Sequence, residues 1–195
     1  MTRHAEERRK TAETDVAVTL ELDGHGTAVV ETGVGFLDHL LTALARHARF
    51  DLRLTCRGDL HVDDHHTAED CALGLGAALD RALGDRRGIA RFGSAHAPLD
   101  EALARAVVDL SGRPLALVDL GLARGAMLGS LATENVGHVL RSLATAARAT
   151  VHVDVLRGEN DHHRAEAAFK AVALALRQAV ARDGDDVPST KGVLV

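Results

Sequence analysis

Residues 61–76, HVDDHHTAEDCALGLG, and residues 158–170, GENDHHRAEAAFK, share the pattern D-H-H-x-x-E. Each copy stands where a helix is expected to begin. A histidine precedes each copy at a nearly equal interval, His39 before the first and His138 before the second. Each of these histidines begins a stretch with helical apolar periodicity, and a stretch of alternating apolar and polar residues follows it. A pattern that recurs in this way predicts a chain built from two repeats of one unit.

Hydrophobic periodicity places similar elements in both repeats. A helical stripe predicts a helix over residues 36–47, and His39 lies off that stripe. The order strands, helix, strand, helix, twice over, predicts an α+β protein with helices packed on one face of each sheet. Alternating apolar residues predict strands at residues 16–22, 27–31, 52–56, 103–110, 115–120 and 151–155.

A long amphipathic helix is predicted to follow each D-H-H-x-x-E pattern. Asp64 is expected to cap the first of these helices, and Gly84 to end it. Asp161 and Gly184 are expected to do the same for the second.

The repeats are expected to meet near residues 86–92, where charge and glycine interrupt the pattern. We assign residues 1–91 to the first repeat and residues 92–185 to the second. The polar residues 186–195 are expected to form a C-terminal tail that orders late or on binding and contributes to the substrate site.

The composition argues against several classes of protein. The net charge is −5, and the chain has no Trp or Tyr and only four Phe, so nucleic acid is a poor first guess. Cys56 and Cys71 form no C-x-x-C pair, and no apolar run is long enough to span a bilayer. We therefore expect a reduced, cytoplasmic protein that does not partner a membrane.

The repeated pattern predicts two metal sites. Positions four apart lie on one face of a helix, so His65 and Glu69 can hold one ion, and His162 and Glu166 another. The second histidine of each pair points elsewhere, but it can reach the ion of the other repeat if the two repeats face each other. We therefore expect one ion held by His39, His66, His162 and Glu166, and a second held by His65, Glu69, His138 and His163.

These nitrogen and oxygen ligands suit Mn(II), Fe(II), Co(II) or Zn(II). Mn(II) is favoured if open positions bind a bidentate substrate, since a structural Zn site closes at four ligands. Whether the two halves of a site meet within one subunit or between subunits does not follow from the spacing.

Several other side chains suit anion chemistry. Arg91, Arg113 and the segment PSTK at residues 188–191 offer guanidinium, hydroxyl and ammonium groups that match phosphate. Each of them alone is more typical of a solvated surface charge. His47 is a further candidate to line a site.

The motifs RKTAETDV, LDGHG, TGVGFLDHLL, GDLHVDDHHTAEDCALGLGAAL, GIARFGSAHAPLDEAL, DLSGRP, GENDHHRAEAAFKA and VPSTKGVL together resemble the imidazoleglycerol-phosphate dehydratase family over nearly the whole chain. Gly35 stands where the family often has proline, and residues 120–130 match least. The resemblance implies a tandem duplication of a unit similar to domain 2 of ribosomal protein S5. It also implies two Mn²⁺ per subunit on the eight predicted ligands, and trimers that assemble into a 24-mer.

The implied reaction is dehydration of imidazole glycerol phosphate to imidazole acetol phosphate in histidine biosynthesis. Two ions would orient and polarise the substrate, and a carboxylate, Glu13 or Glu166, would move protons. The residues that match substrate-contacting positions, or are expected beside them, are Glu13, His47, Arg91, Arg113, Lys170, Ser189, Thr190 and Lys191.

Three other functions remain open on the residues alone. A dinuclear metallohydrolase would release inorganic phosphate and would need bridged ions. A metal-dependent shell or storage protein would have no use for the predicted phosphate residues. A nucleic-acid module, suggested only by the implied fold, agrees poorly with an acidic chain.

Overall fold

The computed structural model describes residues 3–194. Its long helices are α1 (Gly35–Ala48), α2 (His65–Leu83), α3 (Thr133–Ala146) and α4 (Asp161–Ala179). The strands of the first sheet are β1 (His4–Lys10), β2 (Thr14–Glu21), β3 (Ala28–Glu31) and β4 (Asp51–Gly58). Those of the second sheet are β5 (Phe92–Leu99), β6 (Ala102–Asp109), β7 (Leu115–Asp119) and β10 (Thr150–Arg157), and β8 (Met127–Leu128) pairs with β9 (Leu131–Ala132).

The two sheets have equivalent topologies. Their strand orders are β1-β2-β4-β3 and β5-β6-β10-β7. In each sheet the first three strands are antiparallel, and the last strand runs parallel to its neighbour. This equivalence is what a duplicated unit produces, and the predicted α+β fold is confirmed.

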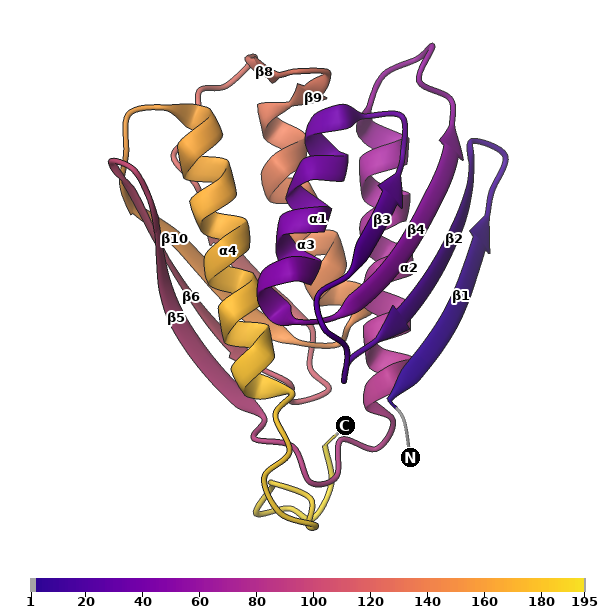
Figure 1. The fold of residues 1–195 in the computed structure, drawn as a ribbon, viewed down its shortest axis with the longest axis vertical. Helices are drawn as coiled ribbons and strands as arrows, with labels where there is room; N and C mark the ends of the chain where they lie inside the picture. Colours follow the sequence, from indigo (N-terminus) through magenta and orange to yellow (C-terminus); the bar gives the residue numbers. More distant parts are fainter. Residues whose placement is uncertain (1–2, 195) are drawn as a thin grey trace.

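The helices form a layer between the two sheets (Figure 1). α2 packs on β1 and β2, and α4 packs on β5 and β6. α1 contacts α4 and α3 contacts α2, so helices of one repeat lie directly against helices of the other. Within residues 3–194, no helix combines the length and apolarity needed to cross a membrane.

The outer strands β1 and β5 were missing from the sequence prediction. Only Ala5 is buried in β1, whose sequence is HAEERRK, and β5 carries Pro98 and mostly small or polar residues. An edge strand with little buried surface leaves a weak alternation, and the pairing with a central strand forms it nonetheless.

Both predicted N-caps were wrong in detail. Asp64 occupies the N-cap of α2, but its carboxylate caps no helix N–H and accepts instead from the amide of Ala132 at 2.8 Å. For α4, the cap is Asn160, whose side chain accepts from His162 N and His163 N. The predicted end at Gly84 is confirmed, whereas α4 ends at Ala179, ahead of Gly184, because the chain turns there to pair with residues beside β5.

The repeats differ most between the third strand and the first helix. In the first repeat, residues 32–34 join β3 to α1. In the second, residues 120–132 join β7 to α3 and include the β8–β9 hairpin. The connection is therefore much longer in the second repeat. When His39 is aligned with His138, Gly137 stands where the first repeat has Asp38.

Replacing Gly76 by alanine is expected to destabilise the protein by about 1–3 kcal/mol, because overpacking forces backbones apart. A Cβ at Gly76 in α2 would lie 2.5 Å from the carbonyl oxygen of Leu143 in α3. Chemical denaturation measures the loss. The matched control is Gly35→Ala, where nothing lies within 4 Å, and an equal loss in both variants would contradict the close packing of α2 on α3.

Candidate functional site

A first group of metal-ligating side chains joins α1 to α4. The Nε2 atom of His39 lies 3.0 Å from Glu166 Oε2, and His162 Nε2 lies 3.3 Å from the same oxygen. One ligand atom from each residue can be chosen so that all lie within 4.8 Å of one another. Phe36 packs against the ring of His162, with 4.9 Å between ring centroids. We call His39, His162 and Glu166 the His39 group.

Two further side chains surround the His39 group. The ammonium of Lys170 lies 2.7 Å from Glu166 Oε1. Burial alone would raise the pKa of Glu166, but the hydrogen bonds from Lys170 and His39 lower it to about 2. Burial and then the charge of Lys170 lower the pKa of His47. Lys170 and His47, both expected at the substrate site, therefore lie within electrostatic reach of Glu166.

A second group joins α2 to α3. His138 Nε2 lies 3.4 Å from Glu69 Oε1, and His65 Nε2 lies 4.0 Å from Glu69 Oε2. The rings of His65 and His138 stack with centroids 4.8 Å apart. These three residues also satisfy the 4.8 Å criterion for a shared ion. We call them the His65 group.

A hydrogen-bond chain orients His65. The Asp64 carboxylate can only accept, so the amide nitrogen of Asn135 faces it at 2.9 Å and the amide oxygen faces His65 Nδ1 at 3.0 Å. Nδ1 must then carry the proton, which leaves the Nε2 lone pair directed at the group. Outer residues that fix a histidine tautomer in this way are typical of metal ligands.

The donor sets fit a divalent ion. His138 Nε2 is buried and has no hydrogen-bond partner in the described structure. A buried unpaired nitrogen costs free energy unless something binds it. Two imidazoles and a carboxylate, without thiolate, suit Mn(II), Fe(II), Co(II) or Zn(II).

The second histidine of each pair lies outside these groups. His66 Nδ1 is 3.0 Å from Asp59 Oδ2, and its Nε2 is 3.8 Å from Glu13 Oε1. His163 Nδ1 is 2.7 Å from Glu101 Oε2. These carboxylates raise the pKa of each histidine. Each Nδ1 therefore donates to a carboxylate, and each Nε2 is directed away from it.

One chain thus brings together three of the four ligands predicted for each ion. The predicted ligand sets brought two histidines to each ion from the other repeat. Within the chain, His39 and His138 reach the other repeat, and His66 and His163 lie outside the groups. Adjacent helix positions point about 100° apart, and His66 and His163 accordingly face carboxylates of their own repeat. Membership of His66 and His163 in the metal sites stays a prediction.

The predicted phosphate residues, Arg91, Arg113 and residues 188–191, also lie close together, and we call them the anion group. Arg91 makes two hydrogen bonds to Asp109, at 2.7 and 3.1 Å, and donates to the carbonyl of Pro188 at 2.8 Å. Arg113 lies 3.7 Å from the same carboxylate. The Ser189 hydroxyl accepts from the amide of Lys191 at 3.2 Å. The tail, which forms turns, is therefore tied to the start of β5.

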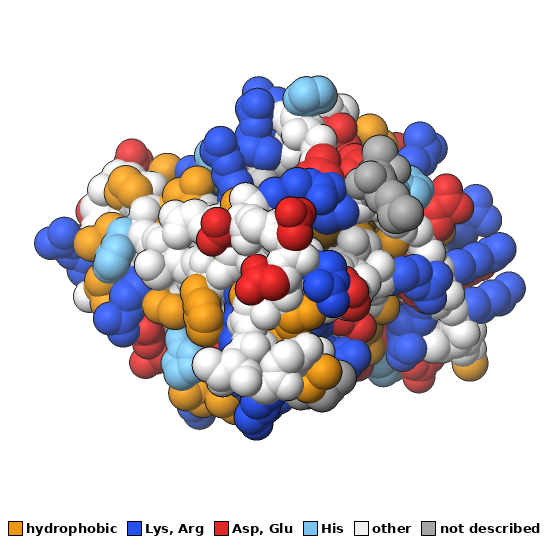
Figure 2. All heavy atoms as spheres, turned by 90° about the horizontal axis from the view of Figure 1, so that it is seen from below, with side chains coloured by type: hydrophobic (Ala, Val, Ile, Leu, Met, Phe, Trp, Pro, Cys, Tyr) orange, Lys and Arg blue, Asp and Glu red, His pale blue; other side chains and the backbone are white. Residues whose placement is uncertain are grey.

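This anion group lies far from the His39 group in one chain. Arg91 N donates to the carbonyl of Ala179, the last residue of α4, whereas His162 lies in the first turn of that helix. A rise of 1.5 Å per residue separates the two positions by about 25 Å. The tail lies at the lower end of Figure 1, opposite the start of α4. Figure 2 views this lower end, where acidic and basic side chains are mixed.

Sequence reasoning missed the outer residues. Asn135 was not singled out, because its partners Asp64 and His65 lie 71 and 70 residues away in sequence. Asp59 and Glu101 lie in loops whose course the periodicity does not specify. Only the position of Asp64, next to the repeated pair, carried a signal, and it was interpreted as a helix cap.

Comparisons with known proteins identify the family of the chain. The sequence pattern of the imidazoleglycerol-phosphate dehydratase family matches residues 32–176. A protein of that name from Candida glabrata is 56% identical over 206 residues, which cover 96% of this chain and 98% of the relative. One from Chlorobium luteolum is 54% identical, over 98% of this chain and 96% of the relative.

The chain belongs to the imidazoleglycerol-phosphate dehydratase family. The predicted enzyme class, a hydro-lyase, and the link to histidine biosynthesis agree with this family. A relative from Phytophthora nicotianae is 61% identical over 98% of this chain, which spans 42% of that protein's length.

Solved structures of the dehydratase family share the fold. The enzyme from Pyrococcus furiosus, in complex with (S)-C348, is 39% identical, with a TM-score of 0.82 over 96% of this chain and 99% of that one. The enzyme from Staphylococcus aureus is 34% identical, with a TM-score of 0.80 over 91% of this chain and 99% of that one.

Asn135→Ala is expected to weaken metal binding at the His65 group by roughly 10–100-fold, because it removes the partner that fixes the His65 tautomer. Metal titration followed by elemental analysis of the dialysed protein measures the effect. The control is Phe36→Ala, the equivalent position beside the His39 group. Unchanged affinity in Asn135→Ala, with the fold intact by circular dichroism, would contradict the role of this hydrogen-bond chain.

Proposed function

We propose that the protein dehydrates imidazole glycerol phosphate to imidazole acetol phosphate and water in histidine biosynthesis. The observation that carries the proposal is the pair of His/Glu groups, each built from both repeats, in a chain of this dehydratase family. The cluster of Arg91 and Arg113 at the tail supports a phosphate-bearing substrate.

Each His/Glu group is proposed to hold one Mn²⁺ with a fourth ligand from a second copy of the chain. His66 would complete the His39 group, and His163 would complete the His65 group. In support, both histidines donate Nδ1–H to a carboxylate, the arrangement that prepares Nε2 for a metal. When bound, the ions supply Lewis acidity and a template for the substrate.

Assembly is part of the proposal. The substrate is small, and the separation of about 25 Å between the two ends of α4 prevents it from touching the anion group and the His39 group of one chain together. Residues from neighbouring copies can meet both of its ends. Trimers that associate into a 24-mer would supply such neighbours in a closed, symmetric arrangement.

The two candidate carboxylates differ in their suitability for proton transfer. The hydrogen bonds of Lys170 and His39 hold the pKa of Glu166 at about 2, so Glu166 stays ionised near neutral pH and serves as a ligand. Glu13 is half-exposed and faces His66 at 3.8 Å. We assign proton movement to Glu13, beside the ligand that a neighbouring copy would share.

The anion group would bind the phosphate. Arg91 and Arg113 already converge on Asp109, and Ser189, Thr190 and Lys191 in the tail would add hydroxyl and ammonium donors. Holding this remote group would fix the reacting carbons against the metal groups. Lys170 and His47 would contact substrate next to Glu166.

The domain limits and compartment complete the proposal. The repeats would comprise residues 1–91 and 92–185, and residues 186–195 would contribute to the substrate site. The protein would act in the cytoplasm.

The Mn²⁺-loaded protein is expected to convert imidazole glycerol phosphate to an enolisable ketone, and chelation should abolish turnover, because the His/Glu groups then lose the ions they position. Ketone formation and inorganic phosphate are measured together. Phosphate release without ketone would instead identify a metallohydrolase. No turnover by assembled, metal-loaded protein would overturn the proposal.

A mixing experiment tests the shared site. His39→Ala and His66→Ala remove ligands that the proposal places on different copies, so each variant alone should be inactive. After chelation and reassembly with Mn²⁺, a mixture should regain up to about a quarter of the wild-type rate. When copies pair at random, about one site in four combines an intact His39 group from one copy with an intact His66 from another.

The matched control is a mixture of His39→Ala and His162→Ala, which damage the same contribution and should stay inactive. Sedimentation establishes that each sample has assembled. If the mixture of His39→Ala and His66→Ala assembles and remains inactive, a site shared between copies in this way is excluded.

A further inference from the structure

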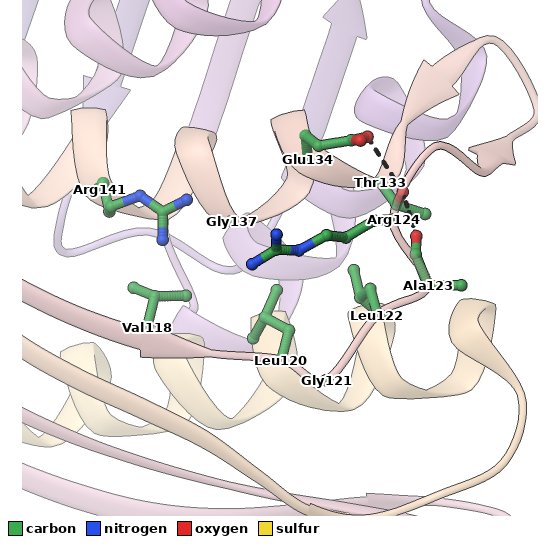
Figure 3. Close-up of a pocket in the computed structure, with 10 residues that line it drawn as sticks. All are labelled: Val118, Leu120, Gly121, Leu122, Ala123, Arg124, Thr133, Glu134, Gly137 and Arg141. Carbon is green, nitrogen blue, oxygen red and sulfur yellow. Dashed lines mark hydrogen bonds between the residues drawn. The ribbon is translucent and has the colours of Figure 1, made fainter.

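A cavity of about 510 Å³ lies between α3, β7 and the loop that follows β7. Figure 3 shows the side chains of Arg124 and Arg141 extending into it, with their guanidinium groups directed toward each other above Val118, Leu120 and Leu122. None of the residues in the two His/Glu groups or the anion group lines this cavity. It is therefore separate from the proposed catalytic residues.

The cavity exists because the second repeat departs from the first. In the first repeat, Asp38 accepts hydrogen bonds from the amide and hydroxyl of Thr32, at 2.9 and 2.5 Å, and ties the short loop to α1. Gly137, at the equivalent position of α3, has no side chain to do this. The longer loop stands off the helix, and the nearest atom to a Cβ added at Gly137 is the guanidinium Nη2 of Arg141, at 3.2 Å.

The charges in the cavity are unbalanced. Among residues 3–194, neither Arg124 nor Arg141 forms a salt bridge or a side-chain hydrogen bond. The one acidic residue of the lining, Glu134, is engaged by the amide of Gly125 at 2.8 Å and by the hydroxyl of Thr133. Backbone hydrogen bonds lower the pKa of Glu134, and Arg124 adds only a weaker long-range effect. Two guanidinium groups thus remain available to an anion.

The floor of the cavity is apolar. Leu120 is buried at 6% exposure, and Val118 and Leu122 are half-buried. Paired guanidinium groups bind carboxylate or phosphate oxygens through charge-assisted hydrogen bonds, and an apolar floor binds hydrocarbon. An inorganic ion would leave that floor uncovered.

We propose that this cavity binds a small organic anion, with its carboxylate or phosphate head between Arg124 and Arg141 and its apolar body on Val118, Leu120 and Leu122. Two guanidinium groups bind a carboxylate or a phosphate, so the test compares these two head groups. The site belongs to the second repeat alone, because only that repeat combines the long loop with a glycine at the contact.

The test titrates hexanoate and hexyl phosphate into the assembled wild-type protein by calorimetry, with inorganic phosphate as a third ligand. At least one organic anion should bind, and the tighter one identifies the head. Arg141→Gln should weaken this binding by about tenfold or more, since it removes a charged hydrogen-bond donor. Arg105→Gln, an exposed arginine outside the cavity, is the matched control and should bind as wild type.

Gly137→Asp gives an independent test. It installs the residue of the first repeat, pairs Arg141 and fills the head position, so binding should again fall by about tenfold or more. Aspartate is no worse than glycine inside a helix, and the flexible Arg141 side chain can move, so the fold should survive. Absence of binding to wild type, binding by Arg141→Gln and Gly137→Asp as tight as by wild type, or equally tight binding of inorganic phosphate would each overturn the proposal.

Discussion

The packing of α1 against α4 and of α2 against α3 is the contact on which both His/Glu groups depend. Each group takes its carboxylate and one histidine from the longer helix and its other histidine from the shorter one. Ligand atoms meet within 4.8 Å only if the two helices keep their spacing and rotation. The sheets outside hold the helices in this arrangement by covering their outward faces, so the chemistry of the centre rests on close packing of small residues such as Gly76.

Much of this arrangement follows from the sequence because it depends on local spacing. The i, i+4 separation of His162 and Glu166 places both on one helix face, and the duplicated pattern identifies two such faces. Alternation likewise identified the central strands, whose side chains are buried on one face. The sequence predicted both His39 and His66 beside Glu166. Which of the two meets Glu166 within one chain depends on the tertiary contacts of the helices, and local spacing does not specify those contacts.

The anion group illustrates a second limit. Arg91 and Asp109 lie at neighbouring strand ends, and their pairing follows from the register of β5 on β6, where Phe92 faces Asp109. That register was unpredictable because β5 itself has little buried surface. The fixed position of the tail beside Arg91 likewise depends on hydrogen bonds between residues far apart in sequence, including the one to Pro188.

The fused repeats have a consequence for the two His/Glu groups. Two identical half-length chains related by a symmetry axis would surround both groups with identical residues. Fusion removes that constraint: Phe36 and Asn135 occupy equivalent positions, as do Leu73 and Lys170. One group therefore has an apolar ring and an ammonium beside it, and the other has an amide that fixes a tautomer. Two equivalent groups within one chain can therefore have different chemical surroundings, which two groups related by exact symmetry cannot.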